Sequence, residues 1–191
     1  MIVRYPKLLS EILKVISEVG APGREKKSKE ATKQGRILYS PKVFNMLFKQ
    51  GFNSRKWGEI KDYFDIEIPD YLHIIKDSYK QCDFSKDRVL VEVQFGKYAF
   101  MFYDLAKFQY FYNKGVIRVG VEIVPCHLLH KEMSSGVSYG EQLIYDLERL
   151  SKNFPSVPVL IILIDMPLDS DDYSLDERIL IHKAFKKEAD N

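Results

Sequence analysis

DFSKDRVLVEVQFGKY, residues 83–98, is the stretch from which the fold is best inferred. It places Asp83 in a predicted turn and then runs into an apolar strand. Because side chains alternate between the two faces of a strand, Glu92 and Gln94 should share one face, opposite the neighbouring valines. A buried polar group without a partner costs about 1–3 kcal/mol. We therefore expect this polar face to bind a hard cation and a phosphate.

The segments after this stretch alternate between helix and strand patterns. Residues 98–115 indicate a helix that ends at a glycine, and residues 117–123 alternate as a strand with one buried face. A helix over about 139–150 and an apolar strand over 157–164 follow. A strand, a crossover helix and a second strand form the βαβ unit of an α/β sheet. The 191 residues fit a single domain, 1–191, with a sizeable core.

Four further helices are predicted outside this unit. Apolar residues at 3–4 spacing predict a helix over 6–20, and Pro41 at a first helical position predicts a second one, with Ser40 as its N-cap and Gly51 at its end. A third helix is expected over about 69–80. A terminal helix should begin at a capping box formed by Ser174 and Glu177. Trp57 and the nearby aromatics are interpreted as core.

Composition excludes several classes of protein. With 46% hydrophobic and 13% aromatic residues the chain is not disordered, and no run approaches eighteen apolar residues. The charged N-terminal pattern is not that of a signal peptide. The two cysteines, Cys82 and Cys126, are too few for a disulfide framework and are expected to be reduced. We expect a soluble, cytoplasmic protein.

The net charge of +2 conceals an uneven distribution. Residues 1–61 contain 14 Lys and Arg against 5 Asp and Glu, and the remaining 130 residues sum to −7. Much of the excess lies between Arg24 and Arg36. Such a run is either solvated surface or a contact with a phosphate backbone, where each neutralised phosphate adds about 0.9 to the log–log salt slope.

The spacing D-x8-E-x-Q resembles the active-site signature of the PD-(D/E)XK nuclease superfamily, with Gln94 where a lysine usually stands. With this glutamine and the residues around it, the sequence resembles type II restriction endonucleases of the BglII/BstYI family, and BstYI is the closer match. Three further runs carry the resemblance in the same order: KQGRILYSP (33–41), VGVEIVP (119–125) and KEMSSGVSY (131–139). The resemblance implies a restriction-endonuclease-like α/β fold, with a central mixed β-sheet flanked by helices, in a prokaryotic enzyme.

The resemblance also implies a Mg²⁺ site. Asp83 and Glu92 would supply carboxylate ligands, with the backbone carbonyl of Val93 and waters completing an octahedron. Gln94 carries no charge and is a poor base, so its expected role is to orient the attacking water or a phosphate oxygen. Asp87 competes with Asp83 as the first acid, and the family alignment favours Asp83.

Other acids and the base-reading residues follow from the same resemblance. Asp70 or Asp77, on the helix predicted over 69–80, could lie near the metal, and the choice between them stays open. Specificity requires contacts to base edges in the major groove. Lys97 and Ser135 are the expected base contacts, within a DNA-binding set that also includes Ser134 and Gly136. A serine hydroxyl suits a relaxed outer base pair because it both donates and accepts.

The family further implies a homodimer on a palindromic site with central GATC, plausibly RGATCY, cut after the first purine to leave 5′ overhangs. A cognate DNA methyltransferase is expected in the same system. Two other functions fit the residues less well. One is a repair or recombination nuclease of the same superfamily without strict specificity, and the other is a DNA-binding module whose catalytic centre has decayed.

Overall fold

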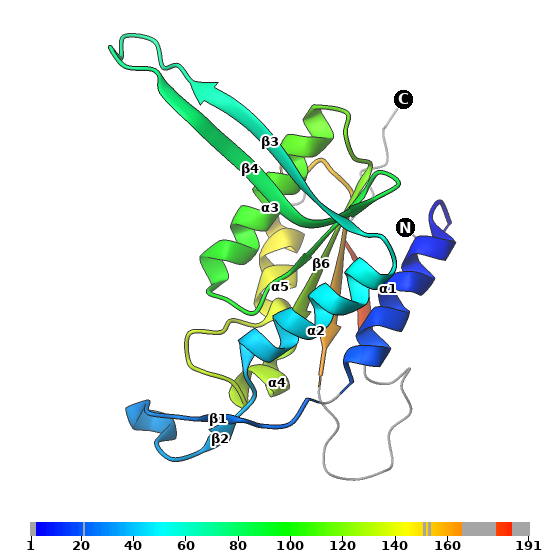
Figure 1. Cartoon of the computed structure of the whole chain (residues 1–191), viewed down its shortest axis with the longest axis vertical. Helices are drawn as coiled ribbons and strands as arrows, with labels where there is room; N and C mark the ends of the chain where they lie inside the picture. Colours follow the sequence, from blue (N-terminus) through cyan, green and yellow to red (C-terminus); the bar gives the residue numbers. More distant parts are fainter. Residues whose placement is uncertain (1–2, 21, 151, 153, 166–178, 185–191) are drawn as a thin grey trace.

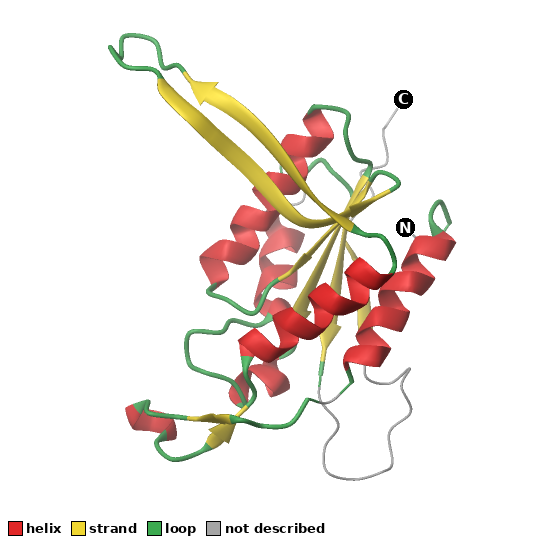
Figure 2. Ribbon diagram, in the orientation of Figure 1, coloured by secondary structure: helices red, strands yellow, loops and turns green. Residues whose placement is uncertain are grey.

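The computed structural model describes residues 3–20, 22–150, 152, 154–165 and 179–184. A six-stranded sheet forms its centre, in the order β3-β4-β5-β6-β7-β8 (Figures 1 and 2). The strands are β3 (Gly58–Ile66), β4 (Ile75–Lys86), β5 (Val89–Val93), β6 (Val119–Pro125), β7 (Val159–Ile164) and β8 (Ile179–Ala184). Strands β5, β6 and β7 run parallel, and the other neighbours pair antiparallel. The mixed α/β sheet expected from the sequence is confirmed.

Helices cover both faces of this sheet. Helices α1 (Pro6–Val19) and α2 (Pro41–Ser54) lie on one face, and α3 (Tyr98–Asn113) and α5 (Gly140–Leu150) lie on the other (Figure 1). The short α4 (His127–Lys131) follows β6. A separate two-stranded sheet, β1 (Lys26–Lys27) with β2 (Ile37–Leu38), encloses the 3₁₀ turn η1 (Ala31–Lys33). None of the described helices combines the length and the apolar character needed to cross a bilayer.

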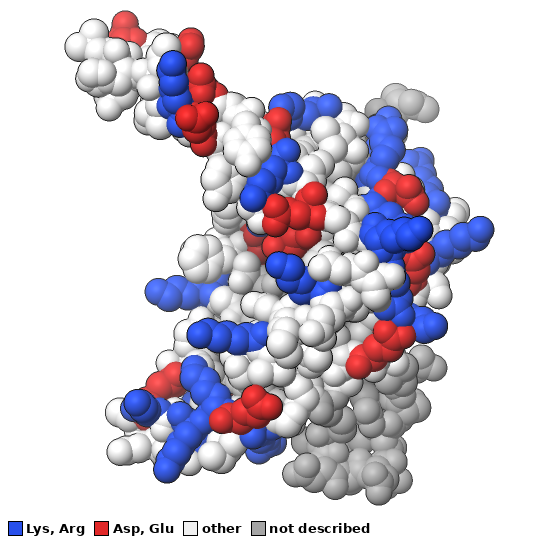
Figure 3. Space-filling view, viewed as in Figure 1, with Lys and Arg blue, Asp and Glu red and all other residues white. Residues whose placement is uncertain are grey.

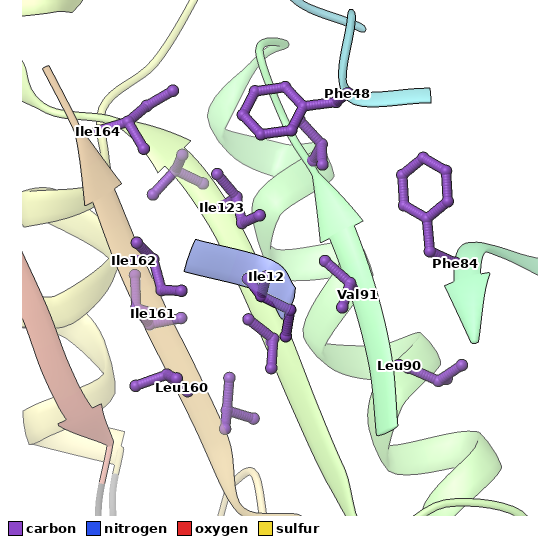
Figure 4. Packing of buried hydrophobic residues seen from close by; sticks show 14 of the residues in the cluster. Ile12, Phe48, Phe84, Leu90, Val91, Ile123, Leu160, Ile161, Ile162 and Ile164 are labelled. Carbon is purple, nitrogen blue, oxygen red and sulfur yellow. The ribbon is translucent and has the colours of Figure 1, made fainter. Parts of the chain in front are cut away.

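The core lies on both faces of the central strands, under α1 and α2 on one side and under α3 and α5 on the other. Figure 4 shows Ile12 of α1 in front of the sheet, between Ile162 of β7 and Val91 of β5, with Phe48 of α2 near Ile123. Every residue of β5, β6 and β7 is buried. Parallel strands covered by helices on both faces are expected to be apolar throughout, so the prediction that residues 117–123 have only one buried face was wrong. The polar residues of β5 and β6 are therefore buried as well.

Helix α2 passes through Gly51, where the sequence predicted its end. A Cβ at this position would lie 2.8 Å from Val15 Cγ1 on α1, so the glycine lets the two helices approach closely. Ser40 precedes the helix as predicted, without a side-chain cap hydrogen bond. A helix interior tolerates glycine at a cost of about 1 kcal/mol relative to alanine, which the packing of α1 on α2 offsets.

The helix predicted over 69–80 does not exist. Residues 75–86 form β4, which pairs with β3 in a long two-stranded ribbon that projects from the body (Figure 1). The ribbon is largely exposed on both sides, so neither face produces the hydrophobic periodicity that marks a strand. Tyr63 and Tyr79 pair across it with ring centroids 5.8 Å apart. Trp57 is 2% exposed, as predicted for the core, whereas Tyr63 is 65% exposed.

The C-terminal prediction was also wrong where it can be compared. Ser174 and Glu177, the proposed capping box, lie outside the described residues. Residues 179–184 form β8, antiparallel to β7. The outer edge of β7 offers unpaired backbone groups, and pairing with another strand satisfies them.

Candidate active site

A two-residue turn determines how Asp83 and Glu92 are placed. Residues 87–88 connect β4 to β5 with φ values of 46° and 68°, the left-handed values of a tight hairpin turn. The resulting register sets Phe84 opposite Val91, so the next position sets Asp83 opposite Glu92. Directly opposed residues of antiparallel strands project on the same face. The two carboxylates therefore share one face of neighbouring strands.

The same register locates the other candidate acids. Asp83 lies within strand β4, so its predicted place in a turn was wrong. Asp87 occupies the turn itself, at the end of β5 away from Glu92. Asp77 lies six residues before Asp83 on the ribbon, about 20 Å along the strand, and Asp70 lies in the ribbon's end loop. None of these three acids is placed opposite Glu92.

A third carboxylate extends the row across the sheet. Glu122 on β6 is the direct register partner of Glu92 on β5. Its side chain is 0% exposed, and neither of its oxygens has a hydrogen-bond partner among the described residues. The alternating pattern of residues 117–123 predicted that Glu122 would lie on the polar face of its strand. The sheet instead aligns acids from three adjacent strands on the face that α3 covers.

Helix α3 places two charged residues over this row. Lys107 Nζ lies 2.5 Å from Glu92 Oε1 and 2.7 Å from Asp104 Oδ1. The Gln94 amide donates to Asp104 Oδ2 over 2.7 Å. Asp104 and Glu92 are 2% and 3% exposed. A connected network thus runs from Glu92 through Lys107 and Asp104 to Gln94, and it holds the Gln94 carbonyl oxygen away from Asp104.

Burial and like charge dominate the electrostatics of the network. Desolvation, with the charges of Asp104 and Asp83, raises the pKa of Glu92 despite the opposing effect of Lys107. Desolvation likewise raises the pKa of Glu122 well above its ordinary value, reinforced by Asp104 and Glu92. Burial by itself would lower the pKa of Lys107, but the two carboxylates it contacts outweigh burial and raise it. The cluster is one in which carboxylates outnumber cations, so added positive charge stabilises their ionised forms.

The donor set fits a hard divalent cation in its chemistry. Asp83 is exposed at the edge of the row and has no hydrogen bond or ion pair among the described residues, while Glu92 adds a second carboxylate. Oxygen ligands of this kind suit Mg²⁺. Within the described ranges, however, no group of three or more His, Cys, Asp or Glu side chains is already arranged around a metal position. The ammonium of Lys107 lies against Glu92 Oε1, so a cation bound at this carboxylate would meet its positive charge.

Two loops bring the predicted DNA-binding residues to one region. Lys97 is the exposed residue that precedes α3, and Ser134–Gly136 lie in the loop between α4 and α5. The backbone N–H of Ser138 donates to the carbonyl of Gly96 over 2.9 Å, which ties the two loops together. The segment that carries Lys97 therefore lies beside the end of the loop that carries Ser134–Gly136.

The basic N-terminal segment supports the serine loop. Lys26 donates to the hydroxyl of Ser134, and Lys33 Nζ donates to the carbonyls of Lys131 and Met133 over 3.0 and 2.6 Å. The backbone N–H of Ser135 donates to Glu30 over 3.0 Å. Part of the basic run thus holds the loop in place, a role that was neither of the two interpretations drawn from the sequence.

One face of the molecule collects these charged groups. Figure 3 shows acidic side chains gathered near its middle, with Lys and Arg on either side. The β3–β4 ribbon and the small β1–β2 sheet project beyond this region at opposite ends, so the face is hollowed between them (Figures 1 and 3).

Asp104, Lys107 and Glu122 are the site residues that the sequence analysis missed. A local signal for two of them was present, because Asp104 and Lys107 are the only charged residues in α3, YAFMFYDLAKFQYFYN. Their spacing of three places them on one side of the helix. The aromatic content of the segment led to its interpretation as core alone.

Comparisons with known proteins agree with this architecture. The sequence model described as restriction endonuclease BglII/BglIII matches residues 1–164. The crystal structure of restriction endonuclease BglII complexed with a DNA 16-mer is similar at a TM-score of 0.59 and 19% identity, covering 93% of this chain and 92% of that chain. The structure of free BglII is similar at 0.60 and 22%, covering 86% and 74%. No curated protein sequence matches the chain.

Proposed function

The chain belongs to the BglII/BglIII family of restriction endonucleases, and on that premise we propose that it cuts duplex DNA at a palindrome with central GATC. It is a type II restriction endonuclease, a DNA-binding nuclease. The proposed full site is RGATCY, cut after the first purine to leave 5′ overhangs. This choice rests on the resemblance to BstYI that we infer from the motif runs of the sequence. The proposed catalytic unit is a single domain.

One observation carries the catalytic part of the proposal. The hairpin register sets Asp83 opposite Glu92, with Gln94 two residues along the same strand face. We infer that an exposed and a buried carboxylate placed in this way share one cation. Restriction endonucleases of this kind are generally dependent on divalent metals, and we propose Mg²⁺ as the cofactor.

In this mechanism Asp83 and Glu92 would hold the cation, together with the backbone carbonyl of Val93. When bound, Mg²⁺ supplies the means to ionise water near neutral pH and offsets negative charge on the phosphate. Gln94 positions the attacking water and does not take a proton from it. Its amide nitrogen donates to Asp104, which leaves its carbonyl oxygen to accept a hydrogen bond from the water. Burial of Glu92 excludes water from the protein side of the site.

Sequence recognition is assigned to the paired loops. Lys97 is proposed to donate to guanine O6 and N7, and Ser135 to contact the outer base pair, within a surface formed with Ser134 and Gly136. Ser134 is already engaged by Lys26, so it is the less available of the two serines. The hollowed, basic-flanked face between the ribbon and the β1–β2 sheet supports this placement of the duplex (Figure 3).

We propose that the enzyme acts as a homodimer, each subunit cutting one strand, because a palindrome is matched by two-fold protein symmetry. Exposed aromatic residues on α3 and α5 offer apolar surface for such a contact, with Phe100, Tyr103 and Tyr145 exposed by 53%, 47% and 54%. Light scattering of the purified protein tests this, and a monomer that stays monomeric on cognate DNA would contradict it. A cognate DNA methyltransferase would protect the host sites.

Asp83→Asn and Glu92→Gln test the catalytic assignment. Each should reduce Mg²⁺-dependent cleavage by about a thousand-fold or more, because metal-based stabilisation contributes several kcal/mol to the transition state. Binding to a cognate duplex in a gel-shift assay should persist. Asp87→Asn, a change in the exposed turn, is the matched control and should cut normally. Cleavage that survives Glu92→Gln would refute the assignment and favour a metal site elsewhere.

Sequencing the fragment ends from one digest of a known genome tests the specificity. Discrete fragments with R^GATCY ends support the proposal. A smear with random ends would instead favour the alternative, a repair or recombination nuclease without strict specificity.

A further inference from the structure

Glu122 is a buried carboxyl group that the proposed mechanism does not use. It is 0% exposed in the middle of β6, flanked along the strand by Val121 and Ile123, and both of its oxygens lack hydrogen-bond partners among the described residues. Nearly all buried polar groups in folded proteins are hydrogen-bonded, so an exception of this kind requires a reason. An apolar side chain of the same size would fill the position at lower cost.

Lys107 is the cation best placed to reach Glu122. Glu92 and Glu122 are register partners on adjacent parallel strands, whose backbones lie about 4.8 Å apart. Lys107 Nζ already contacts Glu92 at 2.5 Å. Helix α3 reaches β5 through Lys107 and β6 through the next residue, Phe108, whose ring fills the space above Gly120. Gly120 lies two residues before Glu122, on the same face of the strand. A small rotation of the four-carbon lysine stem therefore takes the ammonium from one glutamate to the other.

A divalent cation at Glu92 would repel the ammonium of Lys107. The ammonium now contacts one Glu92 oxygen and also Asp104. Two cations at one carboxylate repel strongly in a site of low dielectric constant. A cation at Asp83 and Glu92 would leave the ammonium with Asp104 alone, and solvent offers little compensation because the lysine side chain is only 12% exposed. Glu122 is the described carboxylate on this face that has both oxygens unoccupied.

We propose that Glu122 is the second acceptor of Lys107: the lysine pairs with Glu92 and Asp104 in the metal-free protein and moves to Glu122 when a divalent cation binds. This inference rests on the proposed function, because it takes Asp83 and Glu92 as the cation ligands. Lys107 thereby serves as the counter-ion of the site carboxylates in the metal-free protein. Glu122 is a positioning residue, which acts on the cation through Lys107.

Calorimetric titration with Mn²⁺, monitoring binding rather than cleavage, tests the proposal. The proteins are wild type, Glu122→Leu, Lys107→Met and the double variant, with thermal unfolding used to check that each is folded. Glu122→Leu should weaken Mn²⁺ binding at least about ten-fold, because Lys107 then has no second acceptor. In the Lys107→Met background the same substitution should change the affinity less than about two-fold. This non-additivity is the signature of one residue acting through the other.

Two results would overturn the proposal. Wild-type affinity in Glu122→Leu would show that Lys107 needs no second acceptor, and an equal loss in both backgrounds would show that Glu122 acts on the cation without Lys107. Glu122→Gln, which keeps an oxygen and loses the charge, replaces the leucine variant if that protein does not fold. Asp83→Asn separates the two hypotheses: if it leaves Mn²⁺ binding unchanged the proposed metal site fails, whereas if it abolishes binding and Glu122→Leu has no effect, only the transfer of Lys107 fails.

Discussion

Replacing Glu122 with leucine should stabilise the metal-free protein. The wild-type side chain is fully buried with both oxygens unpartnered, and each unsatisfied buried group costs about 1–3 kcal/mol. Leucine is close to glutamate in volume and suits a fully buried position that Val121 and Ile123 flank along the strand. Allowing for imperfect packing, we expect a gain of about 1–3 kcal/mol in the free energy of unfolding. For a domain of this size that corresponds to roughly 3–9 °C in Tm.

Urea unfolding at pH 7 without divalent cations measures this gain. Glu92→Leu is the matched control on the neighbouring strand, and it should gain no stability because Lys107 loses one of its two carboxylate partners. A loss of more than about 1 kcal/mol in Glu122→Leu would refute the reasoning, since it would mean that the carboxyl group is already satisfied in the folded state. A stabilised variant with impaired cation binding would instead be a trade between stability and function.

Three other outcomes follow from the structure. The pKa of Glu92 is raised from 4.5 to about 8, and that of Glu122 is raised as well. The folded state therefore binds more protons than the unfolded chain. Urea titrations should show the free energy of unfolding falling as pH rises from about 4.5 to 8. Gly140→Ala should lower the free energy of unfolding by about 1–3 kcal/mol in thermal unfolding, because the added Cβ would lie 2.3 Å from methyl groups of the packed strands. Gly58→Ala is the control and should not lower it, because nothing lies within 4 Å of the added Cβ. Lys97→Ala should weaken binding to the cognate duplex by about 1–3 kcal/mol in gel-shift assays, with much less effect on a scrambled duplex.

In the proposed site, Gln94 stands where the signature usually has a lysine, so positive charge beside Glu92 has to come from another residue. Lys107 reaches the same carboxylate from the covering helix. Asp104 fixes both Lys107 and Gln94, so the orientation of the strand glutamine depends on a helix residue ten positions later in the chain.

Local pattern was sufficient for several elements. The 3–4 spacing of apolar residues predicted α1 to within a residue of its observed end, and proline at a first helical position located the start of α2. The apolar runs predicted β5 and β7, and the four ordered motif runs indicated the family that the sequence model then matched. These features depend on neighbours in the chain, so they can be read without knowing the fold.

Pattern failed where an element has little burial or where burial comes from distant residues. The β3–β4 ribbon is exposed on both sides and so lacks a hydrophobic period, and β6 is covered on its second face by α3 and α5, which its own sequence does not record. The candidate site divides in the same way. The sequence by itself determined Asp83, Glu92 and Gln94 as a candidate set and the family to which they point. Only the tertiary structure decided that Glu122 and Lys107 join them, because strand register and helix packing are contacts between residues far apart in the chain.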